Sequence, residues 1–267
     1  MTTTETAVAA ADTAPRDTRQ PRRRRPWQLP AARLAVPLLA LLAWQLIDPV
    51  TDLVPAPADT IRELYSGFVD GWIYEGLRAT ASAVGTGFVL GTVVAFPLGY
   101  LMGSSKTLTA IFEPLVAGTF AVPRVILYPI LLAVFGVGLE AESAMVAISA
   151  FFPILMSTAA AVRNVSPSLL KLGRSLSARP LQIARKIVIP DAAPSIMVGI
   201  RIGFSIAFIA AIIAELFAAK DGLGLLISQS YAVLDLPRMY AVVLLVMLAA
   251  FAGNLLLWWA ERRLRKA

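Results

Sequence analysis

The sequence predicts an all-α membrane protein with about six transmembrane helices, and two observations support this fold class. Of the 267 residues, 58% are hydrophobic and 15% are charged, and the mean hydropathy is +0.72. Soluble domains are about a quarter charged, so this chain has too little charge to cover a water-facing surface of its size. The apolar residues also gather in runs of about 20, the length that a helix needs to cross a bilayer. Backbone groups cannot stay unpaired in lipid, so these runs should be helical.

The N-terminal part of the chain is predicted to be a tail followed by a first span. Residues 1–29 are rich in Thr and Ala, end in RQPRRRRP and lack apolar periodicity, which predicts a disordered, basic, cytoplasmic tail. Residues 30–267 form the predicted transmembrane domain. Its first apolar run extends from about Leu34 to Ile47 and, after the basic residues, could also be a secretory signal. The cleavage-like triplet Ala56-Pro57-Ala58 ends eleven residues beyond Ile47, so an uncleaved span is favoured.

Five longer apolar runs follow, and each is near or above the length of a membrane-spanning helix. Prolines inside them predict kinks, which spanning helices tolerate where neighbours cover the freed carbonyl groups. Gly85, Gly87 and Gly91 in the first of these runs predict close approach of a neighbouring helix. The runs are 79–102, 108–135, 141–161, 192–216 and 239–260, and the prolines are Pro97, Pro123, Pro129 and Pro153.

The distribution of Lys and Arg predicts the orientation of these spans. If the chain starts inside, seventeen of the 24 Lys and Arg residues fall on cytoplasmic segments and four on external ones. Cytoplasmic loops carry the excess of Lys and Arg, so both termini should be cytoplasmic in a multi-pass protein of the cell membrane. The external segment from Pro55 to Trp72 has apolar residues at helical spacing and should be a short amphipathic surface helix.

Composition excludes several kinds of chemistry. The chain contains no Cys and no His, so disulfides, thiolate or imidazole metal sites and His-dependent nucleophiles are excluded. We expect no catalytic residue, no metal site and no cofactor. The net charge of +7 could suggest nucleic acid, but the basic residues flank apolar runs, and we expect the lipid bilayer as their surroundings.

The segment between the fourth and fifth spans is unlike an ordinary connection. Ser166-Pro167 starts a short helix, and Leu169, Leu172 and Leu176 follow at helical spacing. A break from Ser177 to Pro180 precedes a second short helix that ends near Ile189-Pro190. Two amphipathic helices with basic faces could be a docking element, or they could lie on anionic lipid.

This segment resembles the EAA loop of ABC importer permeases, which reads Glu-Ala-Ala, three residues, Gly, nine residues, Ile-x-Leu-Pro. Here Lys171-Leu172-Gly173 stand in place of Glu-Ala-Ala, and Ser177 stands in place of Gly. Ile187-Val188-Ile189-Pro190 follow after nine residues. Further stretches resemble the branch that imports nitrate, sulfonates, taurine and thiamine-precursor pyrimidines: VPAPADTIREL, PRVILYPILLAVFGVG, PSIMVGIRIG, AEL and DGLGLLI. The resemblance covers about residues 31–260.

The resemblance implies a type I ABC importer permease architecture and a coupling loop at about residues 166–190. The chain would be the permease subunit that forms the pathway for a small anionic solute, such as nitrate, a sulfonate or taurine. The implied partners are a dimer of ATP-binding cassette ATPase subunits, an extracytoplasmic solute-binding protein and a second, identical permease subunit. The residues that would couple the permease to the ATPase are Gly173, Ser177, Ala178, Leu181, Ile183, Ile187 and Pro190.

ATP itself should be bound by the partner, so the chain is not expected to be an enzyme. A phosphate-binding loop needs Gly-x4-Gly-Lys-Ser/Thr. Around Lys106 and Thr107, Tyr100 and Ser105 occupy the two glycine positions.

Three ionisable residues in the spans are candidates for the translocation pathway: Arg124, Arg201 and Glu215. Arg124 is the most central, and it either faces a cavity that would attract an anion or bonds to carbonyl groups that the nearby prolines free. Structural pairing is favoured for Arg201, and helix capping or pairing with Arg238 or Lys220 is sufficient for Glu215. The alternative function is a self-sufficient secondary transporter, which should show more carboxylates for ion coupling than these spans contain.

Overall fold

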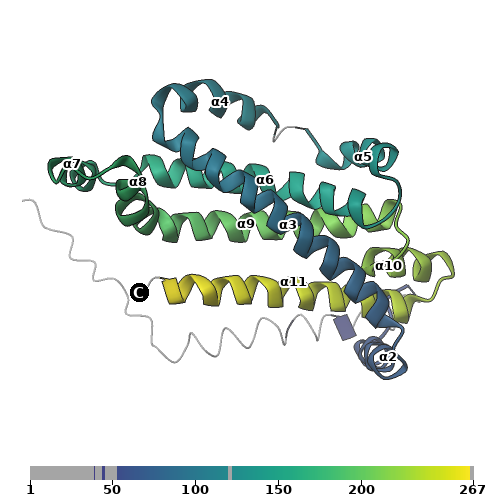
Figure 1. The fold of residues 1–267 in the computed structure, drawn as a ribbon. Helices are drawn as coiled ribbons and strands as arrows, with labels where there is room; N and C mark the ends of the chain where they lie inside the picture. The colour runs from purple at the N-terminus through teal and green to yellow at the C-terminus, as the bar shows by residue number, and fades with distance from the viewer. Residues whose placement is uncertain (1–38, 40–43, 46–52, 120–121, 265–267) are drawn as a thin grey trace, which may run out of the picture.

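A computed structural model describes residues 39, 44–45, 53–119 and 122–264, and the regular elements within these ranges are all helical (Figure 1). The all-α class is therefore confirmed. The elements are α2 (Pro57–Asp70), α3 (Ile73–Ser104), α4 (Lys106–Thr119), the 3₁₀ turn η2 (Arg124–Leu127), α5 (Tyr128–Phe135), α6 (Leu139–Arg163), α7 (Pro167–Ser175), α8 (Pro180–Ile183), the π-helical turn η3 (Ala184–Val188), α9 (Ile189–Phe217), α10 (Leu223–Ala232) and α11 (Leu236–Leu264).

Four helices in the described part of the chain are long and apolar enough to cross a membrane. They are α3, α6, the continuous helix made of α8, η3 and α9, and α11. A fifth span results if α4 and the η2–α5 pair are counted as one bent span. These five correspond to the five longer apolar runs. The predicted tail and most of the predicted first span lie outside the described residues.

The predicted span 108–135 is two helices and not one kinked helix. The direction of the η2–α5 pair differs from that of α4 by 86°. Pro123 precedes the 3₁₀ turn, and Pro129 lies in the first turn of α5. Proline lacks an N–H group and clashes with the carbonyl group four residues earlier, so both prolines favour the start of a helix here over the interior of a longer one.

The core is a layer of α3, α6 and α9, with α11 beside α9, and Figure 1 shows α3 crossing α6 and α9. A stripe of glycines on α3 brings its backbone against α6. A Cβ atom on Gly91 would lie 2.6 Å from the carbonyl oxygen of Ala147, and one on Gly99 would lie 2.7 Å from that of Leu155. Small residues permit this close packing of spanning helices. The expectation for Gly87 and Gly91 is confirmed, whereas Gly85 has no neighbour.

The two ends of the helical layer are formed by different helices. The α7 end, which includes α7, α8 and the C-terminal end of α11, lies opposite the α2 end, which includes α2 and α10 (Figure 1). The segment predicted as a short amphipathic helix is helical as α2, and Gly71 in the left-handed conformation ends it. At the same end the guanidinium of Arg238 stacks on Trp72, 4.0 Å from the ring centroid, as expected for a membrane–water interface.

Candidate coupling segment and translocation site

Helix α7 begins and ends at the residues that its sequence indicates. Pro167 occupies its first turn, and the carbonyl oxygen of Ser166 accepts the N–H groups of Leu169 and Leu170. Its last turn closes on Ser177, which has a positive φ of 53°. The Ser177 N–H group donates to the carbonyl of Arg174, and the Ala178 N–H group donates to that of Gly173, at 3.0 and 3.1 Å. This pair of bonds defines a Schellman motif, whose left-handed position is usually glycine.

Gly173 brings α7 against the second helix of the segment. A Cβ atom at this position would lie 2.8 Å from Cδ1 of Ile187 and 3.3 Å from Cγ1 of Ile183. Both isoleucines are half-buried, so they hold the segment together. Of the residues expected to contact the ATPase, Ile183 and Ile187 therefore pack mainly within the chain.

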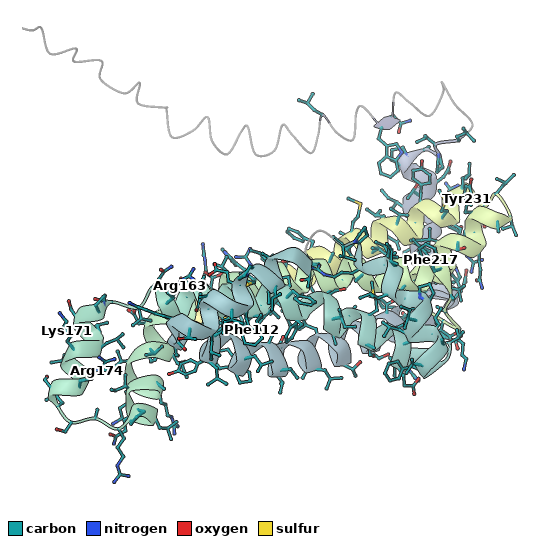
Figure 2. The ribbon with its side chains drawn as sticks, turned by 90° about the horizontal axis from the view of Figure 1, so that it is seen from above. Phe112, Arg163, Lys171, Arg174, Phe217 and Tyr231 are labelled. Carbon is teal, nitrogen blue, oxygen red and sulfur yellow. The ribbon has the colours of Figure 1, made fainter. Side chains whose placement is uncertain are left out.

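The exposed apolar residues of the segment are leucines. Leu172, Leu176 and Leu181 expose 55%, 72% and 78% of their surface at the tip of the α7 end, and we name them the leucine surface. Figure 2 shows this tip extending beyond the main body of helices, with Lys171 and Arg174 on it. Leu181 was among the residues expected to contact the ATPase, whereas Leu172 and Leu176 were not, although their helical spacing is visible in the sequence.

The second short helix is continuous with the fifth span, in contrast to the expected end near Pro190. Helix α8, the π-helical turn η3 and α9 form a single run of 38 residues from Pro180 to Phe217. Pro190 lies in the first turn of α9, directly after η3, and Pro194 lies inside it. π-helical turns are rare, occur mostly as single turns inside α-helices, and often mark a functional position. The coupling segment is thus an extension of a core helix.

Arg124 lies at the break between α4 and α5. Its guanidinium carbon is 5.6 Å from the ring centroid of Phe152, within the range of a cation–π contact. Phe152 is 13 residues from Leu139 and 11 from Arg163, the two ends of α6. At about 1.5 Å per residue, the contact is about 20 Å and about 17 Å from these ends. Arg124 is therefore near mid-depth in the helical layer, and Phe152 is a neighbour that sequence reasoning missed.

Arg201 and Glu215 both have structural partners. Nη1 of Arg201 lies 3.1 Å from Oε2 of Glu261, so the pair joins α9 to α11. One turn further along α9, the side chain of Asn254 in α11 donates a hydrogen bond to the Ser205 hydroxyl at 3.1 Å. For Arg201, this ion pair agrees with the structural pairing that the sequence analysis favoured over a pathway role.

Glu215 is fully buried at the α2 end and organises the start of α10. Its Oε2 accepts hydrogen bonds from the Thr80 hydroxyl at 3.0 Å and from the Gly224 N–H group at 2.8 Å. Thr80 in turn accepts the N–H group of Leu223 at 2.9 Å. One carboxyl group therefore ties α9, α3 and α10 together. Glu215 caps the start of α10, and helix capping was one of the two roles expected for it. The other expected role, an ion pair with Arg238 or Lys220, is not found among these described residues. Thr80 was not recognised because it lies 135 residues away.

Comparison with known proteins identifies relatives over most of the chain. Residues 87–266 match the family model described as "Binding-protein-dependent transport system inner membrane component". A putative ABC transporter permease protein of Methanocaldococcus jannaschii is 31% identical over 84% of this chain and 86% of its own length. The taurine transport system permease protein of Escherichia coli strain K12 is 28% identical over 91% of this chain and 93% of its own length.

Solved structures show the same fold. A chain from the inward facing MetNI methionine ABC transporter superposes with a TM-score of 0.62. The superposition covers 72% of this chain and 94% of the other at 22% sequence identity. This likeness supports the type I importer permease architecture of the helical layer.

Proposed function

The chain belongs to the family of binding-protein-dependent transport system inner membrane components, and we propose that two copies of it form the translocation pathway of an importer for a small solute with an anionic group. It is a multi-pass permease subunit of an ABC transporter in the inner membrane. Membership in this family implies an ATPase and a solute-binding protein as partners, and it disfavours the self-sufficient secondary transporter.

The leucine surface is the proposed contact with the ATPase. Leu172, Leu176 and Leu181 are exposed on a segment whose own packing is completed by Gly173, Ile183 and Ile187. Because α8, η3 and α9 are one helix, a displacement at Leu181 acts along α9 and reaches the core that α9 forms with α6. A rigid element of this kind suits the rigid-body movements by which transporters alternate their access.

The anionic solute is proposed from the position of Arg124. An ionised side chain at mid-depth is costly unless it faces water, a partner or the pathway. Its field favours an anion and disfavours a metal ion or a polyamine. The taurine transport permease among the relatives agrees with a sulfonate group as that anion.

The proposed substrate class is tested by measuring transport by the whole complex. Permease, ATPase and binding protein are reconstituted in liposomes, and the ATP-dependent uptake of taurine, nitrate, an uncharged sugar and a polyamine is compared. We expect uptake of a sulfonate or nitrate only. Uptake of the polyamine alone would refute the anionic solute and leave the permease function intact.

The binding protein is proposed to dock at the α2 end. The last turn of α10 and the turn that follows it expose Tyr231, Val233 and Leu234 by 64%, 75% and 72%. Tyr231 and Phe217 are both at this end of the molecule in Figure 2. The turn precedes Arg238, whose guanidinium stacks on the Trp72 ring as such pairs do at a membrane interface. At that level a protein in the aqueous phase can reach the turn. A photo-cross-linker at Val233 should capture the binding protein, and capture of lipid alone would contradict this docking site.

A further inference from the structure

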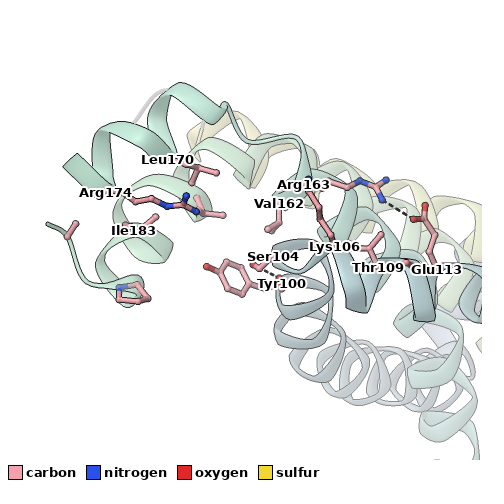
Figure 3. Close-up of a pocket in the computed structure, with 15 residues that line it drawn as sticks. Tyr100, Ser104, Lys106, Thr109, Glu113, Val162, Arg163, Leu170, Arg174 and Ile183 are labelled. Carbon is pink, nitrogen blue, oxygen red and sulfur yellow. Dashed lines mark hydrogen bonds and ion pairs between the residues drawn. The ribbon is translucent and has the colours of Figure 1, made fainter. Parts of the chain in front are cut away.

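A cavity of about 820 Å³ lies between the end of α3, the first turns of α4 and the α7–α8 segment (Figure 3). It is separate from the leucine surface, because Leu172, Leu176 and Leu181 do not line it. Its volume is in the range of sites that hold a small molecule. Of the residues expected to couple to the ATPase, Ala178 and Ile183 line it, and Ile183 packs within the chain on Gly173.

Three cationic side chains from three different elements line the cavity. They are Lys106 at the start of α4, Arg163 at the end of α6 and Arg174 in the last turn of α7. Glu113 also lines it, but its Oε2 lies 2.9 Å from Nη1 of Arg163, which neutralises that pair. Among the described residues, neither Lys106 nor Arg174 has an ion-pair partner. The cavity therefore carries two positive charges that the described chain does not balance.

The wall between these charges is apolar. Val162, Leu170, Ile183 and Val188 line it, with Tyr100 at the end of α3. Figure 3 shows Arg174 extending from α7 over the same space that Val162 and Tyr100 border. A ligand that fits must therefore combine an anionic group with an apolar part. Inorganic phosphate has only the first, whereas a phospholipid has both.

We propose that this cavity binds the phosphate group of an anionic phospholipid, with its glycerol and first acyl carbons against the apolar wall. Basic pockets between helices at the cytoplasmic side of a membrane are suited to anionic headgroups. The distribution of Lys and Arg predicts that the α7 end faces this side. Because Lys106 belongs to α4 and Arg174 to α7, the bound headgroup joins the coupling segment to the membrane-embedded helices.

The test measures lipid retention by the assembled complex of permease and ATPase. The complex is reconstituted in nanodiscs of phosphatidylglycerol or phosphatidylcholine, extracted into detergent and examined by native mass spectrometry. We expect the wild-type complex to retain phosphatidylglycerol and to lose phosphatidylcholine. In Lys106→Gln/Arg174→Gln the affinity for phosphatidylglycerol should fall by about 25-fold, since each basic residue near an anionic lipid contributes about fivefold.

The matched control is Lys171→Gln/Arg185→Gln, which removes two exposed charges from the same segment outside the cavity. It should retain phosphatidylglycerol as the wild type does. Lys106→Gln alone leaves the coupling segment unaltered and should show about fivefold weaker retention. Equal retention by the wild type and the cavity variants would overturn the proposal. Binding of inorganic phosphate that depends on Lys106 and Arg174, without lipid retention, would overturn the lipid as the source of the phosphate.

Discussion

Two residues at opposite ends of the molecule share an unusual backbone conformation. Ser177 and Leu234 have φ values of 53° and 57° and are the non-glycine residues with positive φ in the described chain. Each follows a helix that ends in the same pair of hydrogen bonds. At Leu234, the bonds run from its N–H group to the Tyr231 carbonyl, 3.0 Å, and from Asp235 to Ser230, 2.9 Å. An L-residue in this conformation costs about 1–2 kcal/mol. The turns that present the leucine surface and the Tyr231–Leu234 surface are therefore both strained.

Ser177→Gly should stabilise the end of α7. Glycine removes the cost of the left-handed conformation but loses more entropy on folding, about 0.5–1 kcal/mol, so a net gain of about 0.5–1 kcal/mol remains. The last-turn amides of α7 should then exchange hydrogen about two- to fivefold more slowly. Ser177→Val should have the reverse effect, because a β-branched residue suits this conformation worst. Faster exchange in the glycine variant would contradict the observed turn.

Arg124→Gln should strongly reduce uptake while the subunits still assemble, because the charge near mid-depth is lost and a polar, hydrogen-bonding side chain is kept. Arg124→Lys should be milder, since it keeps the charge. Uptake in liposomes and recovery of the ATPase on the purified permease measure the two effects separately. If Arg124 only supports the break between α4 and α5, both variants should assemble poorly. Normal uptake of the anion by a well-assembled Gln variant would exclude a required charge.

At the scale of elements, the α7–α8 segment separates residues that hold it together from residues that it exposes. Leu176→Asp/Leu181→Asp should abolish co-purification of the ATPase, since each buried leucine contributes about 1.5–3 kcal/mol to a contact. Membrane insertion should be unaffected, because both side chains are exposed in the permease itself. The matched Leu176→Met/Leu181→Met variant keeps the apolar surface and should retain the ATPase. Full ATPase recovery with the Asp variant would show that the leucine surface does not dock.

The start of α10 depends on the Glu215–Thr80 contact. Thr80→Val has nearly the same shape, but it removes one bond to the buried carboxyl and leaves the Leu223 N–H group without its acceptor. The loss of about 2 kcal/mol should lower the thermal midpoint of the purified permease by roughly 4–8 °C. Ser82→Ala is the control, because that hydroxyl bonds only to the Ala79 carbonyl within its own helix. An unchanged midpoint in Thr80→Val would refute the structural role.

The sequence predicted elements better than their contacts. Hydropathy located the four described spans and the apolar run that forms the bent α4 and η2–α5 pair, because burial in lipid depends on composition along one segment. It could not distinguish Leu181, which is exposed, from Ile183, which packs on Gly173, since both are apolar residues of the same short helix. The break at Arg124 was expected as a kink, because prolines indicate a loss of hydrogen bonds but not the direction of the chain after it. The partners of Glu215 and Arg201 lie far away in sequence and required the fold.

At the scale of the whole molecule, charge and aromatic residues distinguish the two ends. Lys171, Arg174, Arg179, Arg185 and Lys186 all belong to the α7 end. There Arg262 and Arg263 also stack on Trp258 and Trp259, with guanidinium carbons 3.6 and 3.7 Å from the ring centroids. Such pairs suit a membrane interface, where an aromatic ring lies at the level of the headgroups. The helices between the ends expose mainly apolar side chains, as a lipid-facing surface requires.

This asymmetry predicts that the α7 end faces the cytoplasm and the α2 end faces outward. The chain has no cysteine, so a single introduced cysteine reports the side on which it lies. Ser175 in α7 and Val233 after α10 are both exposed. A membrane-impermeant maleimide should label Val233→Cys in intact cells, and it should label Ser175→Cys only after the membrane is opened. Transport assays of both variants control for correct assembly. Labelling of Ser175→Cys in intact cells would place the leucine surface outside, where no cytoplasmic ATPase can reach it, and the coupling proposal would fail with the orientation.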